Sequence, residues 1–326
     1  YSVYAAQERV YVTLSGLDES LEEGIKLFEH ILANVQPNQE AFENGVADKL
    51  KDRADTKLNK GAILYGGLMN YGMYGDNAPI KNILSADELK GLDPNNLVAK
   101  IKELTSYEHY IYYYGRKDIE AVKTLLNENH KTPETLKPLI VAIDFPELTM
   151  EKNVVYFVDY DMVQSEVMML SNAGAYNKDL AATTKVFNQY FGGGLSSIIF
   201  QEIRESKALA YSAYAAYTTP RKPNKAHFVR AYIGTQVDKL ADAKKAIMEL
   251  MNEMPEVEDQ FQDSKMAALK KIETSRTKRS SLFWKYLSTK EMGRDSDINE
   301  EIYPQIKSLQ LADLKTFFNS NIAGKN

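Results

Sequence analysis

The stretch Phe191–Ser212 reads FGGGLSSIIFQEIRESKALAYS and carries three local signals in a row. Three consecutive glycines predict a tight turn, because glycine reaches backbone conformations that other residues avoid. The apolar residues that follow have helical spacing, which predicts a helix over about Leu195–Arg204. An alternating, tyrosine-rich segment begins at Tyr211 and predicts a strand.

The strand signal at Tyr211 belongs to an internal repeat. The hexapeptide Tyr211–Ala216 (YSAYAA) matches Tyr1–Ala6 (YSVYAA) at five of six positions. A second alternating segment, an amphipathic helix, a long helix, an aromatic-rich helix and a short last helix follow each copy in the same order. The matched pairs, in order, are Val10–Leu14 and Phe228–Ile233, Leu21–Asn34 and Leu240–Met254, the long-helix starts Asn38–Phe42 and Val257–Phe261, Ile63–Tyr74 and Leu282–Met292, and Leu92–Leu104 and Leu311–Phe318. This ordered self-similarity predicts two related units.

The second unit, residues 149–326, is the fuller one. It is expected to open with strands at Val154–Val158 and Glu166–Asn172 and a helix at Leu180–Tyr190, ahead of the strands at Tyr211–Tyr217 and His227–Ile233. Strands in this order, interspersed with helices, predict an α+β fold in which helices pack on one face of an antiparallel sheet.

Residues 1–128 are expected to form only the second half of such a unit. The opening strands and helix have no counterpart before Tyr1, so this unit is predicted to be truncated at its N-terminus. It is expected to close with a strand at Glu108–Tyr114 and a helix that Asp118 caps. Residues 129–148 contain Pro133, Pro138 and Pro146 with little periodicity, and they are predicted to be a linker.

Composition excludes several classes of function. The formal net charge is −5. Non-specific binding of nucleic acid needs a basic surface, so no nucleic-acid partner is expected. No apolar run approaches the roughly 18 residues needed to span a bilayer. The chain has no cysteine, which removes disulfides, thiolate metal ligands and thiol nucleophiles.

From Phe191 to Ser212 the sequence closely resembles the signature of the non-catalytic, C-terminal-type domain of the M16 (pitrilysin/insulinase) metallopeptidases. That signature is a glycine-rich turn, then Ser-x-Leu/Ile-Phe-x-x-Ile/Leu-Arg-Glu, then Leu-Ala/Gly-Tyr-Ser. The order of elements matches this domain from about Leu148 onward, and Tyr1–Leu126 resembles the second half of another such domain. The resemblance implies part of a longer zinc protease whose two α+β units enclose a chamber.

In active members of the family, one unit carries an inverted zinc motif, His-x-x-Glu-His, and a downstream Glu. This chain has four histidines, and none lies three or four residues from another. The nearest match, Lys26–His30 (KLFEH), has Lys in place of the first His, and a protonated amine cannot bind zinc. We therefore expect an ordinary amphipathic helix here, no metal, cofactor or catalytic residue in this chain, and no activity of the chain alone. The zinc is expected on a partner catalytic M16 unit.

The resemblance also implies an Arg and a Tyr seven residues apart that contact substrate, and Arg204 and Tyr211 have this spacing. In active relatives the Tyr hydrogen-bonds the scissile carbonyl or its oxyanion, and the Arg lies beside it as a fixed positive charge. Judged without the resemblance, Arg204 is typical of a cation at a helix end and Tyr211 of an aromatic residue in a strand. Gly192, Gly193 and Gly194 are expected to form a turn close to substrate or to the other unit.

Two functions stay open at this point. The chain is either the inactive half of an M16 zinc endopeptidase, which completes the chamber and binds the peptide, or a scaffold of the same fold, like the respiratory-complex core proteins. The presence of both Arg204 and Tyr211 favours the first. The expected partners are a catalytic M16 unit and a peptide substrate. The resemblance points to the bacterial periplasm or cell envelope, a compartment that the residues themselves leave open.

Overall fold

The computed structural model describes residues 1–6 and 8–325. The chain divides into two compact units, each built from two separate pieces of sequence. Unit 1 consists of Tyr1–Thr56 and Ile83–Asp144, and unit 2 of Lys57–Asn82 and Phe145–Asn326. This division differs from the one drawn from the repeat chiefly at Lys57–Asn82, which packs within unit 2.

Unit 1 combines an antiparallel β-hairpin with helices. Its elements are β1 (Ser2–Ala6), β2 (Arg9–Thr13), η1 (Asp18–Ser20), α1 (Leu21–Asn34), α2 (Gln39–Thr56), α4 (Ala86–Lys90), α5 (Pro94–Lys102), η5 (Leu104–Ser106) and α6 (Ile119–Asn129). In the hairpin, Ser2 lies opposite Thr13. The predicted cap of α6 is confirmed, because the Asp118 carboxylate accepts a hydrogen bond from the Ala121 backbone N–H at 2.9 Å.

The framework of unit 2 is a three-stranded antiparallel sheet. Its strands are β3 (Gln164–Ala175), β4 (Ser212–Thr218) and β5 (Ala226–Gln236), in the spatial order β3-β5-β4. Ala231 of β5 lies opposite Met169 of β3 and Ala215 of β4, and this face of the sheet contributes to the hydrophobic core. Side chains alternate between the two faces of a strand, so the neighbouring Tyr232 lies on the opposite face.

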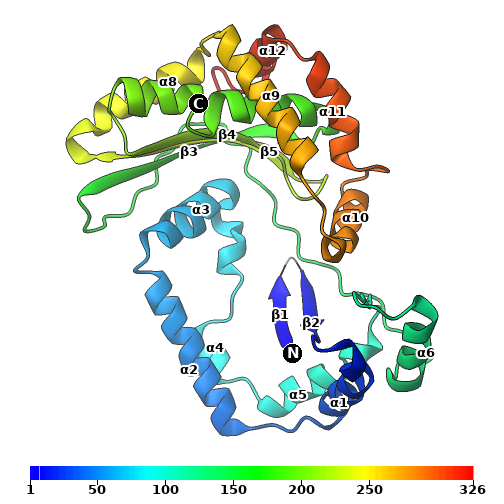
Figure 1. Cartoon of the computed structure of the whole chain (residues 1–326). Helices are drawn as coiled ribbons and strands as arrows, with labels where there is room; N and C mark the ends of the chain where they lie inside the picture. The colour runs from blue at the N-terminus through cyan, green and yellow to red at the C-terminus, as the bar shows by residue number, and fades with distance from the viewer. Residues whose placement is uncertain (7, 326) are drawn as a thin grey trace. The chain divides into compact units, whose positions relative to one another are not determined.

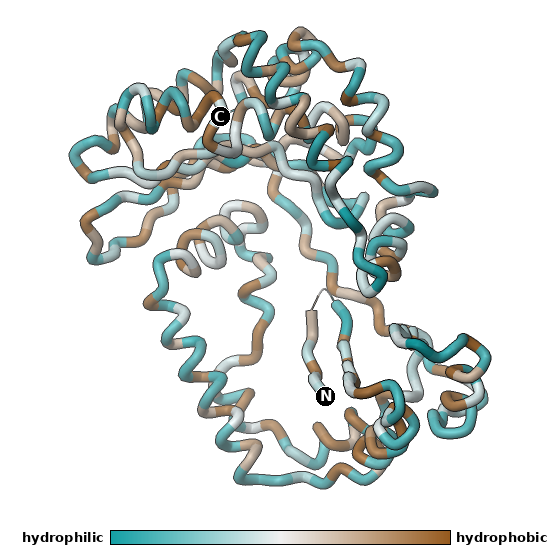
Figure 2. Tube along the Cα trace, viewed as in Figure 1, coloured by the Kyte–Doolittle hydropathy of each residue, from teal (hydrophilic) through white to brown (hydrophobic). Residues whose placement is uncertain are grey.

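Helices cover the core face of this sheet (Figure 1). They are η6 (Lys178–Leu180), α7 (Ala181–Phe187), η7 (Asn188–Gly192), η8 (Phe200–Ser206), η9 (Val237–Lys239), α8 (Leu240–Asn252), α9 (Glu258–Thr274), α11 (Ile298–Ser308) and α12 (Leu311–Asn321). η10 (Arg279–Ser281) and α10 (Leu282–Glu291) lie between α9 and α11 in the chain and contribute no side chain to the core. Figure 2 shows hydrophobic and hydrophilic residues alternating along α8 and α9, as amphipathic helices require. Phe187 anchors the packing, since its ring lies 5.1 Å from those of Phe191 and Phe317.

The expectation that helices cover only one face is wrong for unit 2. The segment Lys57–Asn82, which contains η2 (Ala62–Leu68), α3 (Met69–Tyr74), η3 (Gly75–Asn77) and η4 (Pro79–Lys81), packs on the other face. Lys60 pairs with Glu166 of β3 at 2.7 Å, and the hydroxyls of Tyr65 and Tyr214 are 3.2 Å apart. The second face is rich in aromatic side chains, and an aromatic-rich helix removes them from water.

Two predicted strands are also wrong. Val154–Val158 is irregular, with Val155 and Phe157 87% and 84% exposed. Glu108–Tyr114 forms no strand, and the nearest pairing is an isolated parallel bridge between Tyr107 and Lys137. β-branched and aromatic residues favour a strand, but the strand forms only when a neighbour takes up its backbone hydrogen bonds.

His227 is a buried histidine in β5, and it is 1% exposed. Its Nδ1 lies 3.0 Å from the Thr218 carbonyl oxygen, and its Nε2 lies 3.0 Å from the Asn177 backbone N–H. A carbonyl only accepts and an N–H only donates, so the neutral ring with its proton on Nδ1 satisfies both partners. Burial lowers the pKa of His227 below its ordinary value.

The stability of unit 2 is therefore expected to fall on acidification. The unfolded chain takes up a proton at His227 below about pH 6.5, while the folded chain resists it, so the stabilising contribution is present above that pH and lost below it. Urea midpoints at pH 7 and pH 5 measure this difference, and it should shrink in His227→Gln. The exposed His30 provides the control, because His30→Gln should leave the difference unchanged. Equal pH dependence in wild type and His227→Gln would refute the assignment.

Candidate functional site

The glycine turn is shaped by packing between a helix and a strand. η7 ends at Gly192, which is buried, and a Cβ atom added there would lie 1.7 Å from the Ala215 carbonyl oxygen of β4. Only glycine allows this approach. Gly193 donates its backbone N–H to the Asn188 carbonyl at 2.8 Å, and Gly194 has φ +102°, a left-handed conformation that favours glycine. The close approach made by Gly192 is thus to this chain's own backbone.

The loop between the predicted site residues is held by hydrogen bonds from two directions. The Leu209 backbone N–H donates to the Ile203 carbonyl at 2.9 Å, and the buried Thr235 hydroxyl donates to the Leu209 carbonyl at 2.6 Å. Lys239 donates to the Ala208 carbonyl at 3.0 Å, and Ala208 itself has φ +49°. These bonds fix the path of the chain from η8 to β4, and with it the positions of both ends of the loop.

Arg204 lies on η8 with its side chain 48% exposed. Its guanidinium carbon lies 4.9 Å from the centre of the Phe200 ring, and its Nε lies 3.7 Å from the Glu205 carboxylate. A pair between exposed side chains binds weakly and exchanges readily with water. Arg204 therefore presents a positive charge that an incoming carbonyl or carboxylate group can reach.

Tyr211 immediately precedes β4 and is 54% exposed. Its backbone N–H donates to the Gly234 carbonyl at 2.9 Å, and its hydroxyl oxygen accepts a hydrogen bond from the Gln236 amide at 2.8 Å. A phenol both donates and accepts, and among the described residues its O–H proton has no acceptor. Gln236 thus orients the hydroxyl while its proton remains available.

The structure places Arg204 and Tyr211 at the two ends of the same fixed loop, and no direct contact joins the two side chains among the described residues. Both are exposed to solvent. The seven-residue spacing that indicated the pair corresponds to the last helical turn of η8 and the loop that ends at Tyr211, immediately before β4. The hydrogen bonds that hold this loop come from Thr235 and Lys239, which are distant from it in the sequence. No local sequence pattern indicated these two residues.

The partial zinc motif lies on α1, and each of its three polar side chains has another partner. Lys26 donates to Glu22 at 2.6 Å, Glu29 pairs with His130 at 2.7 Å, and His30 contacts Asn34. Among residues 1–6 and 8–325, no three His, Asp or Glu side chains gather in a way that could hold a metal ion. The described residues therefore do not fit a catalytic zinc, which needs three protein ligands and an open position.

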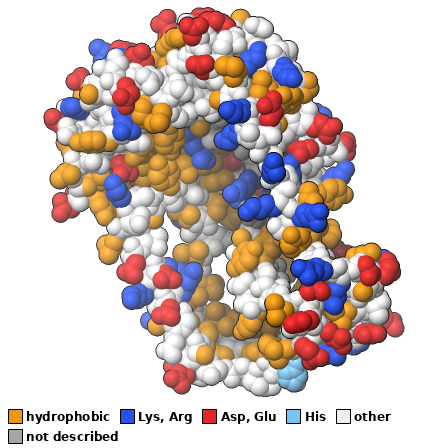
Figure 3. All heavy atoms as spheres, viewed as in Figure 1, with side chains coloured by type: hydrophobic (Ala, Val, Ile, Leu, Met, Phe, Trp, Pro, Cys, Tyr) orange, Lys and Arg blue, Asp and Glu red, His pale blue; other side chains and the backbone are white. Residues whose placement is uncertain are grey.

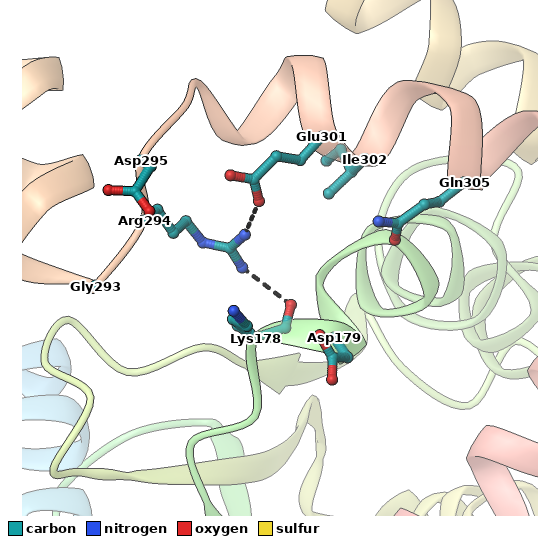
Figure 4. Close-up of a pocket in the computed structure, with 8 residues that line it drawn as sticks. All are labelled: Lys178, Asp179, Gly293, Arg294, Asp295, Glu301, Ile302 and Gln305. Atoms are coloured by element: carbon teal, nitrogen blue, oxygen red, sulfur yellow. Dashed lines mark hydrogen bonds and ion pairs between the residues drawn. The ribbon is translucent and has the colours of Figure 1, made fainter.

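Unit 2 also contains a cavity of about 400 Å³ that no sequence pattern indicated (Figure 4). Lys178, Asp179, Gly293, Arg294, Asp295, Glu301, Ile302 and Gln305 line it. Arg294 is 7% exposed, pairs with Glu301 and donates to the Lys178 carbonyl at 2.9 Å. A buried Arg whose charge is already matched ties the loop before α11 to η6, so we assign it a structural role.

A comparison with known protein families identifies the family of this chain. The family model described as the peptidase M16 inactive domain matches residues 109–272, half of the chain. The chain belongs to this family. It is thus a non-catalytic M16 half, as the resemblance predicted from Phe191–Ser212. Among curated proteins, none matches the sequence.

Solved structures share the M16 fold. The peptidase M16 inactive domain from Pseudomonas fluorescens is 17% identical with a TM-score of 0.66, covering 94% of this chain and 74% of that one. The ferredoxin protease FusC in complex with Arabidopsis ferredoxin is 10% identical with a TM-score of 0.69, covering 94% and 34%. The periplasmic protease PqqL from Escherichia coli is 12% identical with a TM-score of 0.63, covering 93% and 34%.

Two surface properties complete the description of this M16 half. Acidic, basic and hydrophobic side chains alternate over the upper surface of unit 2 in Figure 3, in keeping with the small net charge. None of the helices that the structure describes combines the length and apolarity needed to cross a bilayer.

Proposed function

We propose that this chain is the substrate-facing, non-catalytic half of an M16 zinc endopeptidase, and that Arg204 and Tyr211 bind the peptide around the scissile bond. The observation that carries the proposal is the Tyr211 hydroxyl, which Gln236 orients while its proton stays uncommitted among the described residues. An oriented, solvent-accessible O–H is what a developing oxyanion requires.

The two side chains have different tasks in this proposal. Tyr211 donates its proton in a hydrogen bond to the substrate carbonyl, and this bond strengthens as negative charge develops on the oxygen. Arg204 attracts carbonyl or carboxylate groups of the bound peptide, because its guanidinium is charged at all relevant pH values. The loop held by Thr235 and Lys239 keeps both groups in place before the substrate arrives, which lowers the entropic cost of binding.

The partners follow from the missing metal site. A catalytic M16 unit, in the same or another chain, supplies the zinc, and the peptide lies between that unit and this one. The FusC structure contains a protein, ferredoxin, in complex with a protease of the same fold, which supports a polypeptide as the ligand. The likeness to the periplasmic PqqL supports the bacterial periplasm as the compartment.

The scaffold alternative predicts different behaviour. A scaffold has no chemical use for an exposed cation and an uncommitted hydroxyl at the ends of one fixed loop. If the chain is a scaffold, replacing either side chain leaves the activity of the assembly unchanged, so the variants described in the Discussion separate the two functions.

The chain on its own is expected to bind no stoichiometric zinc and to cleave no peptide. The described residues lack a three-ligand site, and Lys26 stands where a ligand would be needed. Metal analysis of the purified chain and a peptide-cleavage assay measure both properties. One tightly bound zinc per chain, lost in His30→Ala, would contradict this expectation.

A further inference from the structure

Unit 1 contains a hydrogen-bonded chain of side chains that the proposed function does not use. Glu29 of α1 contacts His130 at the end of α6, with 2.7 Å between the carboxylate and Nδ1. The Nε2 atom of His130 lies 2.9 Å from Nε2 of His109, and Nδ1 of His109 lies 2.6 Å from the Tyr107 carbonyl oxygen. We call Glu29, His130 and His109 the histidine bridge.

The geometry of the histidine bridge is that of a hydrogen bond. The two rings are nearly perpendicular, at 84°, and their centres are 5.1 Å apart. This separation is close to the 2.9 Å Nε2–Nε2 distance plus one ring radius at each end, so the two nitrogens point at each other. If both nitrogens bound a tetrahedral metal ion, they would instead point toward the ion, which would lie to one side of the line that joins them.

Counting protons shows what holds the two rings together. The Tyr107 carbonyl can only accept, so Nδ1 of His109 carries a proton. The Glu29 carboxylate likewise accepts, so Nδ1 of His130 carries a proton. With both rings neutral, two lone pairs would face each other at 2.9 Å and repel. The contact therefore needs one additional proton between the rings, and Glu29 balances its charge. Moving a proton from His130 to Glu29 leaves this count unchanged.

We propose that the histidine bridge is a pH-dependent latch that ties the chain at His109 and the end of α6 to α1. The latch is closed while the two rings share one proton. It opens as rising pH removes that proton, and it also opens in acid when both rings become charged. The Glu29 and His130 side chains are only 18% and 15% exposed, so water does not take over their contact in the closed state.

Most of the other charged groups on α1, α5, α6 and the adjoining segments have partners of their own. On α1, Lys26 pairs with Glu22 at 2.6 Å and with Glu23 at 3.9 Å, and it also interacts electrostatically with Glu128. On and after α6, Lys123 pairs with Glu120 at 2.8 Å, and Lys131 donates to the Glu128 carbonyl at 2.6 Å. Lys137 pairs with Glu103 at 3.6 Å, and the last turn of α5 contains Lys100 and Lys102. His30 contacts Asn34. Glu29 is therefore the carboxylate that balances the shared proton.

Nuclear magnetic resonance of the histidine rings tests the latch on the whole chain, whose four histidines give few signals. Free histidine changes charge near about pH 6.5, so spectra at pH 6 and pH 9 bracket the loss of a shared proton. At pH 6 we expect a bridging proton coupled to both Nε2 atoms and ring-to-ring contacts between His109 and His130. At pH 9 both signals should be lost, and they should return on acidification to pH 6.

Variants make the assignment specific. The bridging proton should disappear in His109→Gln and in His130→Gln and persist in His30→Gln, since His30 lies beside Glu29 but outside the bridge. The wild-type pH series needs no variant and so covers the case in which a substitution unfolds unit 1. Ring-to-ring contacts that persist at pH 9, or a missing bridging proton at pH 6, would overturn the latch. Stoichiometric zinc that shifts both Nε2 signals at pH 7 would also overturn it, in favour of a metal site.

Discussion

Tyr211→Phe is expected to lower peptidase turnover by roughly two to three orders of magnitude when the chain is assembled with its catalytic M16 unit. The substitution removes one hydroxyl, the donor assigned to the developing oxyanion. Because the oxyanion forms only at the transition state, the loss should appear mainly in kcat and much less in KM. Steady-state kinetics on a peptide substrate measure both constants.

Stability provides the control for this variant. The Tyr211 ring is half exposed and its hydroxyl bonds only Gln236 among the described residues, so Tyr211→Phe should unfold at nearly the same urea concentration as wild type. Arg204→Ala should raise KM as well as lower kcat, because a fixed charge also acts on the bound substrate. A destabilised but fully active Tyr211→Phe protein would show that the hydroxyl is structural.

Gly192→Ala is expected to destabilise unit 2 by about 3 kcal/mol or more, at the upper end of the cost of overpacking. The new Cβ would lie 1.7 Å from the Ala215 carbonyl oxygen, which is strand backbone and cannot rotate away. η7 would have to move off β4, and Phe191 beside it would leave the core. The free energy of unfolding, measured with urea, reports the effect.

Gly193→Ala is the matched control, one residue along the same turn. A Cβ at Gly193 would meet the Asn188 carbonyl oxygen at 3.4 Å, an ordinary contact, and φ is −133°. This variant should lose far less stability. If Gly192→Ala were as stable as Gly193→Ala but lowered peptide binding, the turn would be serving substrate rather than the packing of η7 on β4.

The parts of the fold that were predictable from sequence are those whose signals are local. β4 alternates because one of its faces lies in the core, and α8 has the 3.6-residue period of a helix with one buried face. Val154–Val158 has the β-branched and aromatic residues typical of a strand but no partner strand among the described residues. Local pattern therefore identifies a segment able to form a strand, and tertiary pairing decides whether it does.

The segment Lys57–Asn82 illustrates the same limit at the level of domains. Its apolar period predicted a helix at Ile63–Tyr74, and the chain is helical there as η2 and α3. Nothing in that period says which sheet the helix will cover. Lys60 with Glu166, and Tyr65 with Tyr214, decide the matter through contacts between residues more than a hundred positions apart.

The candidate site likewise combines features that have a local sequence signal with features that depend on tertiary contacts. The spacing of Arg204 and Tyr211 is local, and the motif around them indicated the pair. The hydrogen bond that orients the Tyr211 hydroxyl comes from Gln236 on the neighbouring strand, and the loop is held by Thr235 and Lys239. The histidine bridge joins three segments of the chain, so no sequence spacing could indicate it.

Peptide hydrolysis by the chain and its catalytic M16 unit, assayed separately and together, decides whether this chain completes an active peptidase. We expect no cleavage by the chain alone, with or without added zinc, and little cleavage by the catalytic unit alone. The two together should cleave the peptide fully, and a chelator should abolish this activity. Tyr211→Phe should reduce it at least a hundredfold, roughly the effect of losing one oxyanion donor. Chelator-sensitive cleavage by the chain alone, or a catalytic unit equally active without it, would contradict the account.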